Sequence, residues 1–171
     1  MGSGAAVLNG HCTCRACAYR LLDAPLVVHA CHCRWCQRET GSAFVLNAVI
    51  EARRVELTAG SPVLTTVPSE SGRGQDIHRC PDCHVALWSV YRGLGPRFLF
   101  VRAGTLETPE ACPPDVHIYT GSKLSWIHLP EDVPVQEEYY RRSDIWPEAA
   151  LARRLATLAL SDADAAGPRR A

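Results

Sequence analysis

The chain lacks the features that mark secreted and membrane proteins. Its first ten residues contain neither a charged segment nor an apolar run of the length that a signal peptide needs, and no later stretch is apolar enough to span a bilayer. An excess of either charge is also missing, because 18 basic residues balance 18 acidic ones. A neutral chain has no electrostatic drive toward nucleic acid or an anionic membrane. We therefore expect a cytoplasmic protein with neither nucleic acid nor membrane as its partner.

Helical periodicity is scarce between residues 11 and 140. Short segments rich in aliphatic, β-branched and aromatic residues alternate there with glycine and proline, which is typical of small antiparallel sheets. The expected strands cover residues 19–22, 44–50, 63–67, 85–91 and 97–103. At 171 residues with 47% hydrophobic content, the chain can bury one sizeable core. The sequence predicts a mainly β fold.

The pattern changes after residue 140. Pro147 can occupy a first helical turn, and three leucines (Leu151, Leu155 and Leu158) recur at helical spacing, with Arg153 and Arg154 turned away from them. This predicts a short amphipathic helix whose leucines pack on their own domain or, alternatively, in the groove of a homo-oligomer. Residues 163–171 have too little apolar content to pack, so we expect them to be disordered.

What the sequence has in abundance is cysteine, with nine in the chain. Cytoplasmic thiols are kept reduced and an odd number leaves one unpaired, so close spacing favours metal binding over disulfides. Seven of the nine lie in three clusters: Cys12 and Cys14; Cys31, Cys33 and Cys36; and Cys80 and Cys83. Zinc takes four protein ligands in a structural site but three plus an open position in a catalytic one. Seven thiols therefore predict two zinc ions per chain.

The pattern CxCRxC occurs twice, at residues 12–17 and 31–36, and spacing alone leaves both copies able to supply three thiolates. After the first copy the chain continues as a strand, whose alternation turns Cys17 away from the preceding two cysteines and into the core. After the second copy the sequence is polar and turn-prone, so the chain can curl and bring Cys36 round to the same ion. The second copy is therefore the better three-cysteine site.

Cys80 and Cys83 form a CxxC turn in which Pro81 favours the tight conformation that aims both thiolates at one ion. Cys12 and Cys14 would complete a four-cysteine site and tie the first strand to a distant segment. Because structural zinc binding is coupled to folding, this site should contribute substantially to stability.

The three-cysteine cluster has an alternative reading as a second closed site, with Cys112, Cys17 or a histidine as its fourth ligand. No fourth thiol lies within a short motif, which favours the open site. On a strand, alternation turns His32 away from its flanking cysteines, whereas His29 points the same way as they do. We expect both histidines to be packing residues, although either could move a proton.

The segments GHCTC, CHCRWCQRETGSAF, RCPDCHVALW and HIYTGSKLSW follow one another within residues 10–137. Together they resemble the glutathione-dependent formaldehyde-activating enzyme family, which also includes centromere protein V. The resemblance implies an Mss4-like fold around two zinc ions. We expect the zinc domain at 10–140, between a flexible segment at 1–9 and a helix with a tail at 141–171. The resemblance matches the structural zinc to Cys12, Cys14, Cys80 and Cys83, and the catalytic zinc to Cys31, Cys33 and Cys36.

The resemblance implies a carbon–sulfur lyase that joins a small thiol substrate such as glutathione to formaldehyde. Many relatives carry the zinc sites without an established substrate, so a non-catalytic zinc scaffold is the alternative. His84 departs from the family, which usually has glycine there. Lys123 could attract a substrate carboxylate and Trp126 could line its pocket; the alternative is a solvated lysine and a tryptophan that packs in the core.

Overall fold

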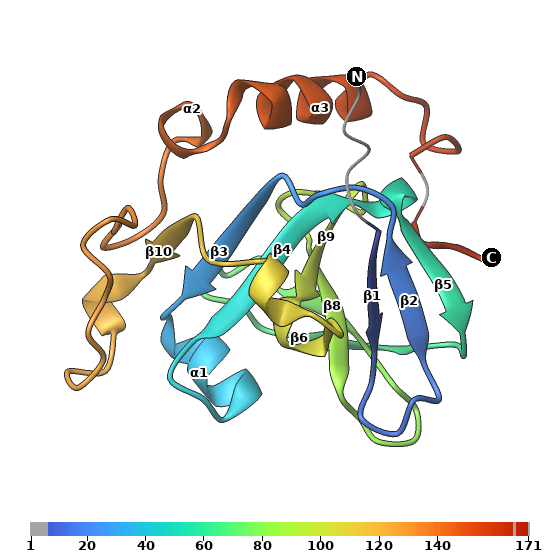
Figure 1. Ribbon diagram of the computed structural model, residues 1–171, viewed down its shortest axis with the longest axis horizontal. Helices are drawn as coiled ribbons and strands as arrows, with labels where there is room; N and C mark the ends of the chain where they lie inside the picture. Colours follow the sequence, from blue (N-terminus) through green and yellow to red (C-terminus); the bar gives the residue numbers. More distant parts are fainter. Residues whose placement is uncertain (1–6, 166, 171) are drawn as a thin grey trace.

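The computed structural model describes residues 7–165 and 167–170, whose strands form two sheets (Figure 1). In spatial order, the small sheet consists of β1 (Leu8–His11), β2 (Ala18–Leu21), β5 (Val55–Ala59) and β11 (Arg169–Arg170). The large sheet consists of β10 (Val116–Ile118), β3 (Val27–Cys31), β4 (Val45–Glu51), β9 (Phe98–Arg102), β8 (Ala86–Tyr91), β7 (Gln75–Arg79) and β6 (Val63–Val67).

Most neighbouring strands run antiparallel, while β10 is parallel to β3 and β11 is parallel to β5. The helices are α1 (Arg34–Thr40), α2 (Arg142–Ile145) and α3 (Glu148–Leu158), with 3-10 turns at Ala52–Arg54, Ala103–Thr105, Pro109–Ala111 and Thr120–Ser122. The predicted mainly β fold with a short C-terminal helix is confirmed. Among the described residues, no helix is long and apolar enough to cross a membrane.

The central strands of the large sheet are covered on both faces. Every residue of β3 and of β9 is buried, which explains their almost continuous apolar sequences. Side chains alternate between two cores. On one face Val28, Ala48 and Val101 pack toward the small sheet, and on the other Val27 and Phe100 pack toward the segment that contains α2 and α3.

The polar segment after Cys33 forms a helix rather than the expected turn. The Cys33 side chain caps α1 by accepting a hydrogen bond from the backbone N–H of Cys36, and Gly41 ends the helix in the left-handed conformation at φ 65°. Only one side chain of α1, that of Cys36, is buried. A helix of two turns with one buried residue has no apolar periodicity, which is why the sequence pattern did not reveal it.

Helix α3 lies across one end of the sheets, as Figure 1 shows. Of its leucine stripe, Leu151 packs against the core, whereas Leu155 is 63% and Leu158 41% exposed. The predicted packing on the chain's own domain therefore holds for Leu151 and not for the other two leucines. The domain-facing side carries Ala150 and Arg153 instead.

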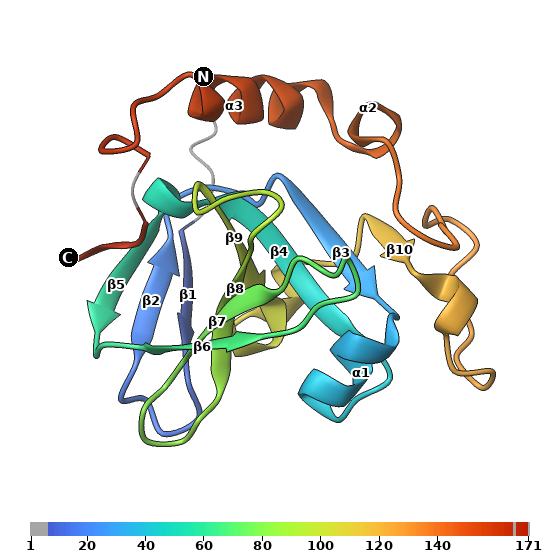
Figure 2. The same ribbon diagram turned by 180° about the vertical axis from the view of Figure 1, so that it is seen from behind.

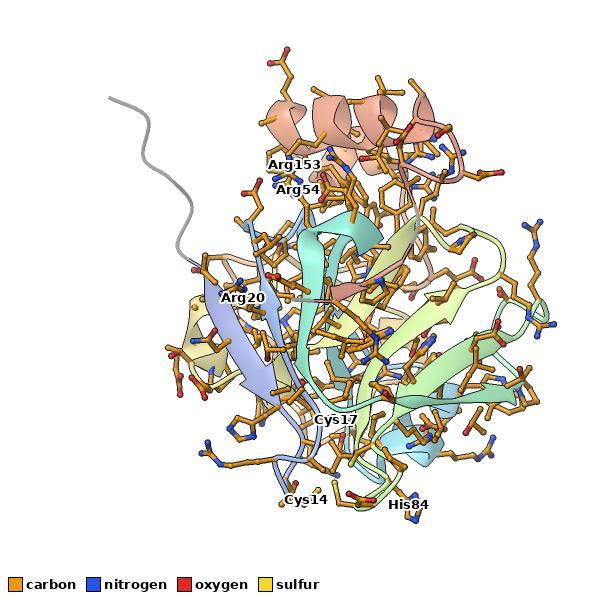
Figure 3. All side chains as sticks on the ribbon, turned by 90° about the vertical axis from the view of Figure 1, so that its right-hand side faces the viewer. Cys14, Cys17, Arg20, Arg54, His84 and Arg153 are labelled. Carbon is orange, nitrogen blue, oxygen red and sulfur yellow. The ribbon has the colours of Figure 1, made fainter. Side chains whose placement is uncertain are left out.

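A buried carboxylate explains this orientation. Glu51 at the end of β4 is fully buried and accepts hydrogen bonds from Arg153 Nε at 3.0 Å and Nη2 at 2.6 Å. Arg54 Nε lies 3.3 Å from the same carboxylate, and Arg54 also pairs with Asp23. Figure 3 shows Arg54 and Arg153 close together beneath α3. A buried charge without a partner is costly. Pairing Glu51 with Arg153 therefore stabilises the fold more than burying the two leucines would.

The ends of the chain differ in part from expectation. Of the expected flexible segment 1–9, residues 1–6 lie outside the described part of the chain, while Leu8 and Asn9 belong to β1. Of the tail expected to be disordered, Arg169 and Arg170 pair with β5 in parallel, although residues 166 and 171 are not described. An edge strand offers unpaired backbone groups, so this pairing needs no apolar side chains.

We predict that Arg153→Met lowers the free energy of unfolding by about 3 kcal/mol, because it leaves the Glu51 carboxylate buried with only part of its hydrogen bonding. Leu155→Ala, on the exposed side of the same helix, should change it by less than about 0.5 kcal/mol. Urea unfolding of both variants checks this. Equal losses of unfolding free energy in the two variants would contradict this, because they would mean that Leu155 is packed against the domain.

Candidate metal centres

Two turns at one end of the molecule bring four cysteines together. Cys12 and Cys14 lie in the turn between β1 and β2, and Cys80 and Cys83 lie in the turn between β7 and β8. Their four Sγ atoms all lie within 4.8 Å of one another. Figure 3 places Cys14 and His84 at this end, opposite α3.

The two turns share one backbone pattern. The N–H of Cys12 donates to the carbonyl of Cys17, and the N–H of Cys80 donates to the carbonyl of Val85, both at 3.0 Å. Each turn contains a residue other than glycine in the left-handed conformation: Arg15 at φ 63° and His84 at φ 60°. This tight curvature aims both thiols of a turn at the same point.

The sulfur geometry of the four-cysteine group suits a tetrahedral ion. Cys14 Sγ lies 3.5 Å from Cys12 Sγ and 3.6 Å from Cys80 Sγ. Four sulfurs around zinc at about 2.3 Å are separated by about 3.8 Å. All nine cysteines are free thiols. Backbone hydrogen bonds, first that to Cys14, lower the pKa of Cys83 to about 6, which favours the thiolate that a metal needs.

Cys17 lies beside the four-cysteine group without belonging to it. Its side chain is fully buried in the core, and its backbone N–H donates to Cys12 Sγ at 3.3 Å. The predicted burial of Cys17 is confirmed. Gly60 leaves room for this thiol, since a Cβ there would lie 2.8 Å from Cys17 Sγ.

The three-cysteine group is built around the start of α1. Cys31 ends β3, Cys33 caps the helix, and Cys36 lies in its first turn. Their Sγ atoms also lie within 4.8 Å of one another, and all three residues are buried. Among the described residues, no further cysteine, histidine or carboxylate joins either group. Cys112, one of the alternative fourth ligands, is buried in the opposite core.

The three thiols share their negative charge unevenly. Hydrogen bonds from Cys31 and then Cys36 lower the pKa of Cys33 to about 3, whereas the pKa of Cys31 is raised well above its ordinary value, first by its hydrogen bond with Cys33. All three thiols can lose their protons together only if a cation offsets the repulsion between the charges. The structure thus contains two cysteine groups that could bind metal, consistent with zinc. The ligand roles of the individual cysteines stay a prediction.

A cavity of about 150 Å³ opens beside the three-cysteine group. Its floor is the face of the large sheet, with His29, Asn47, Gln75, Tyr91 and Phe100. The walls come from α1, from the chain at Ile118 and Tyr119, from Tyr139, and from residues 69–71. Figure 2 shows the loop after β6, which holds these three residues, curving past β3.

Two polar residues of the cavity floor, His29 and Asn47, belong to a row that continues to Arg102, which does not line the cavity. His29, Asn47 and Arg102 are neighbours in register on β3, β4 and β9. Arg102 is buried and donates to Asn47 Oδ1 and to Ser89 Oγ, the latter at 2.8 Å. Because the Asn47 oxygen is taken by Arg102, the amide N–H₂ is the part of this side chain left for a ligand.

His29 is oriented by a hydrogen-bonded pair of aromatic residues. Trp146 Nε1 donates to the hydroxyl of Tyr140 at 2.8 Å, and this hydroxyl lies 2.5 Å from His29 Nε2. Since the indole can only donate, the Tyr140 hydroxyl accepts from it and donates its own hydrogen bond to His29 Nε2. Nε2 is then an acceptor, and His29 carries its proton on Nδ1. Burial, and then the charge of Arg142, lower the pKa of His29 to about 3. This histidine is therefore neutral.

His32 faces the other way, as strand alternation predicted. Its Nε2 lies 3.0 Å from His117 Nδ1, and its ring packs against Phe44. It does not line the cavity.

The substrate contacts expected at Lys123 and Trp126 gain no support from the geometry. Lys123 Nζ donates to the carbonyls of Leu124 at 3.2 Å and Ile127 at 2.7 Å, and Trp126 is 65% exposed. Neither side chain lines the cavity. The sequence reasoning missed Asn47, although an amide within an otherwise apolar strand was a usable signal.

Comparison with known proteins now identifies the family. The family model for the glutathione-dependent formaldehyde-activating enzyme matches residues 7–122. The chain belongs to this family. A comparison with curated proteins finds no match. A crystal structure of a Rhodobacter sphaeroides protein, a structural genomics target, aligns at 17% identity with a TM-score of 0.44, covering 74% of this chain and 98% of that one.

The family match contains all seven clustered cysteines but not the whole cavity. Tyr139, Tyr140 and Trp146 lie beyond its end at residue 122. At His84, where the resemblance implied a glycine, the backbone is left-handed, a conformation that glycine adopts without strain.

We predict two zinc ions in the purified protein and different consequences for losing each. Cys33→Ser should leave one zinc and a folded chain, because its site has only three protein ligands. Cys80→Ser should abolish cooperative unfolding, because that zinc joins two distant turns. Metal analysis and urea unfolding measure both. Cys112→Ala, at a buried thiol outside both groups, is the control and should retain two ions.

We predict that His84→Gly raises the free energy of unfolding of the zinc-loaded protein by about 1 kcal/mol, because it removes a side chain from a left-handed backbone position. Arg15→Gly, in the matching turn, should give a similar gain. Thermal unfolding provides the measurement. A loss of stability in His84→Gly would mean that contacts of the imidazole outweigh the backbone strain.

Proposed function

We propose that this chain is a zinc-dependent carbon–sulfur lyase that makes and breaks the bond between a thiol and formaldehyde. The observation that carries the proposal is the group Cys31, Cys33 and Cys36, which is buried at the wall of a cavity and has no fourth protein ligand among the described residues. The description of the family to which the chain belongs names glutathione and formaldehyde, which supports this chemistry. A structural site with four protein ligands would leave no coordination position open to a ligand in the cavity.

The reaction conserves oxidation state. A thiol R–SH and formaldehyde give R–S–CH₂OH: the S–H bond breaks, a C–S bond forms, and the proton ends on the former carbonyl oxygen. Cys31, Cys33 and Cys36 would hold the zinc, which when bound would keep the substrate thiol deprotonated near neutral pH. The remaining requirements are a hydrogen-bond donor for the carbonyl oxygen, which becomes negative as sulfur attacks, and a way to exclude water.

The chain offers Asn47 as that donor. Its oxygen is fixed by Arg102, so its amide N–H₂ faces the cavity without a competing acceptor among the hydrogen bonds described. His29, held with its proton on Nδ1, lies next to it in register. A donor already oriented before the reaction stabilises developing oxygen charge without reorganisation. Aromatic walls at Trp35 and Tyr119 limit the access of water.

The test is thiol–formaldehyde exchange followed by NMR with zinc-loaded protein. Wild type should accelerate the exchange, and Cys36→Ala should abolish the acceleration. Asn47→Asp keeps the oxygen that Arg102 needs but loses the amide donor, so the rate should fall by about a hundredfold with the zinc content unchanged. Full zinc occupancy without exchange or thiol binding would favour the non-catalytic scaffold.

A further inference from the structure

The lining of the cavity is mostly aromatic and aliphatic. Besides the cysteines and His29, it presents five aromatic rings and two aliphatic side chains: Trp35, Tyr91, Phe100, Tyr119, Tyr139, Leu94 and Ile118. The neutral polar side chains are those of Asn47, Gln75, Ser69 and Ser71. Such a lining favours a flat or apolar ligand group.

The lining offers no positive charge for a carboxylate. Among the described residues that line the cavity, none is lysine or arginine, and Glu70 is the one carboxylate. Arg102 lies behind Asn47, and its guanidinium is engaged by Asn47 and Ser89. The side chain of Arg73 reaches the rim, where a Cβ on Gly93 would lie 3.1 Å from its Cδ, but it is not part of the lining. An anionic ligand would therefore lose water without gaining a partner inside.

One wall of the cavity comes from outside the family match. The ring of Tyr139 stacks on that of Tyr140 with centroids 4.8 Å apart and an interplanar angle of 12°. Tyr140 is held by Trp146 and His29, so the stacked pair is fixed in place. An aromatic side chain from this chain's own extension thus lines the same cavity as the three cysteines.

We propose that the thiol taken by this site is a small uncharged one with an aromatic or apolar group, and not glutathione. The inference rests on the proposed function, since it assumes that a thiol enters the cavity. A volume of about 150 Å³ is comparable to that of an engineered protein cavity that holds benzene. Glutathione carries a carboxylate at each end, for which the lining of the cavity offers no cation.

A matched pair of ligands tests the proposal by calorimetric titration of the zinc-loaded full chain. Benzyl mercaptan and 4-(mercaptomethyl)benzoate differ by one carboxylate on the ring. We expect benzyl mercaptan to bind at least about tenfold more tightly than the carboxylate and than glutathione. Tyr139→Ala should weaken benzyl mercaptan and leave the zinc content unchanged, because it removes the ring but no cysteine.

A charge-reversal variant sharpens the result. Glu70→Lys places a cation at the cavity and should bring the affinity of the carboxylate ligand to within about threefold of that of benzyl mercaptan. Glu110→Lys makes the same charge change away from the cavity and should leave the preference as in wild type. Arg73→Gln should also leave it, since Arg73 contributes only to the rim.

The possible outcomes separate the two proposals. If glutathione or the carboxylate binds as tightly as benzyl mercaptan, the inference about charge is overturned while the thiol site stands. If all three ligands fail to bind the zinc-loaded protein, the proposed function fails and takes the inference with it. Preference for the uncharged thiol, reduced by Glu70→Lys but not by Glu110→Lys, supports both.

Discussion

The pleat of the central strands β3, β4 and β9 determines where the functional side chains lie. These strands are buried on both faces, so each successive residue must suit one of two cores. One face carries Cys31, His29 and Asn47, and the opposite face packs toward the small sheet and the four-cysteine end. A shift of one residue in register would exchange the environments and place the polar row among aliphatic side chains.

The same alternation sets the charge balance of the cavity. Three thiolates with one divalent ion would carry a net negative charge, and such a charge is costly in a buried place. Arg102 lies on this face of β9, beside Asn47, and interacts electrostatically with Cys36. It brings a positive charge near the cysteines without entering the cavity. Arg102 can therefore offset the net negative charge of the metal group, so a positively charged ligand is not required.

The sequence predicted best what depends on short-range geometry. The spacing within CxC and CxxC brings two thiols to one side of a turn. The burial of Cys17 follows from its position before β2, whose Tyr19 and Leu21 lie in the same core. The orientation of α3 could not be predicted in this way, because it depends on Glu51, which lies 102 residues before its partner Arg153. Local periodicity favours Leu155 over Arg153 as the buried residue, and only the position of the carboxylate reverses that order.

The cavity could not be predicted from the motifs because it is assembled across the family boundary. The cysteines come from within the matched region, whereas Tyr139, its stacking partner Tyr140, and Trp146, which donates to Tyr140, come after residue 122. The two contributions are physically joined at His29, which lies two residues from Cys31 and accepts the hydrogen bond from Tyr140. The extension can therefore shape the cavity without changing the three cysteines beside it.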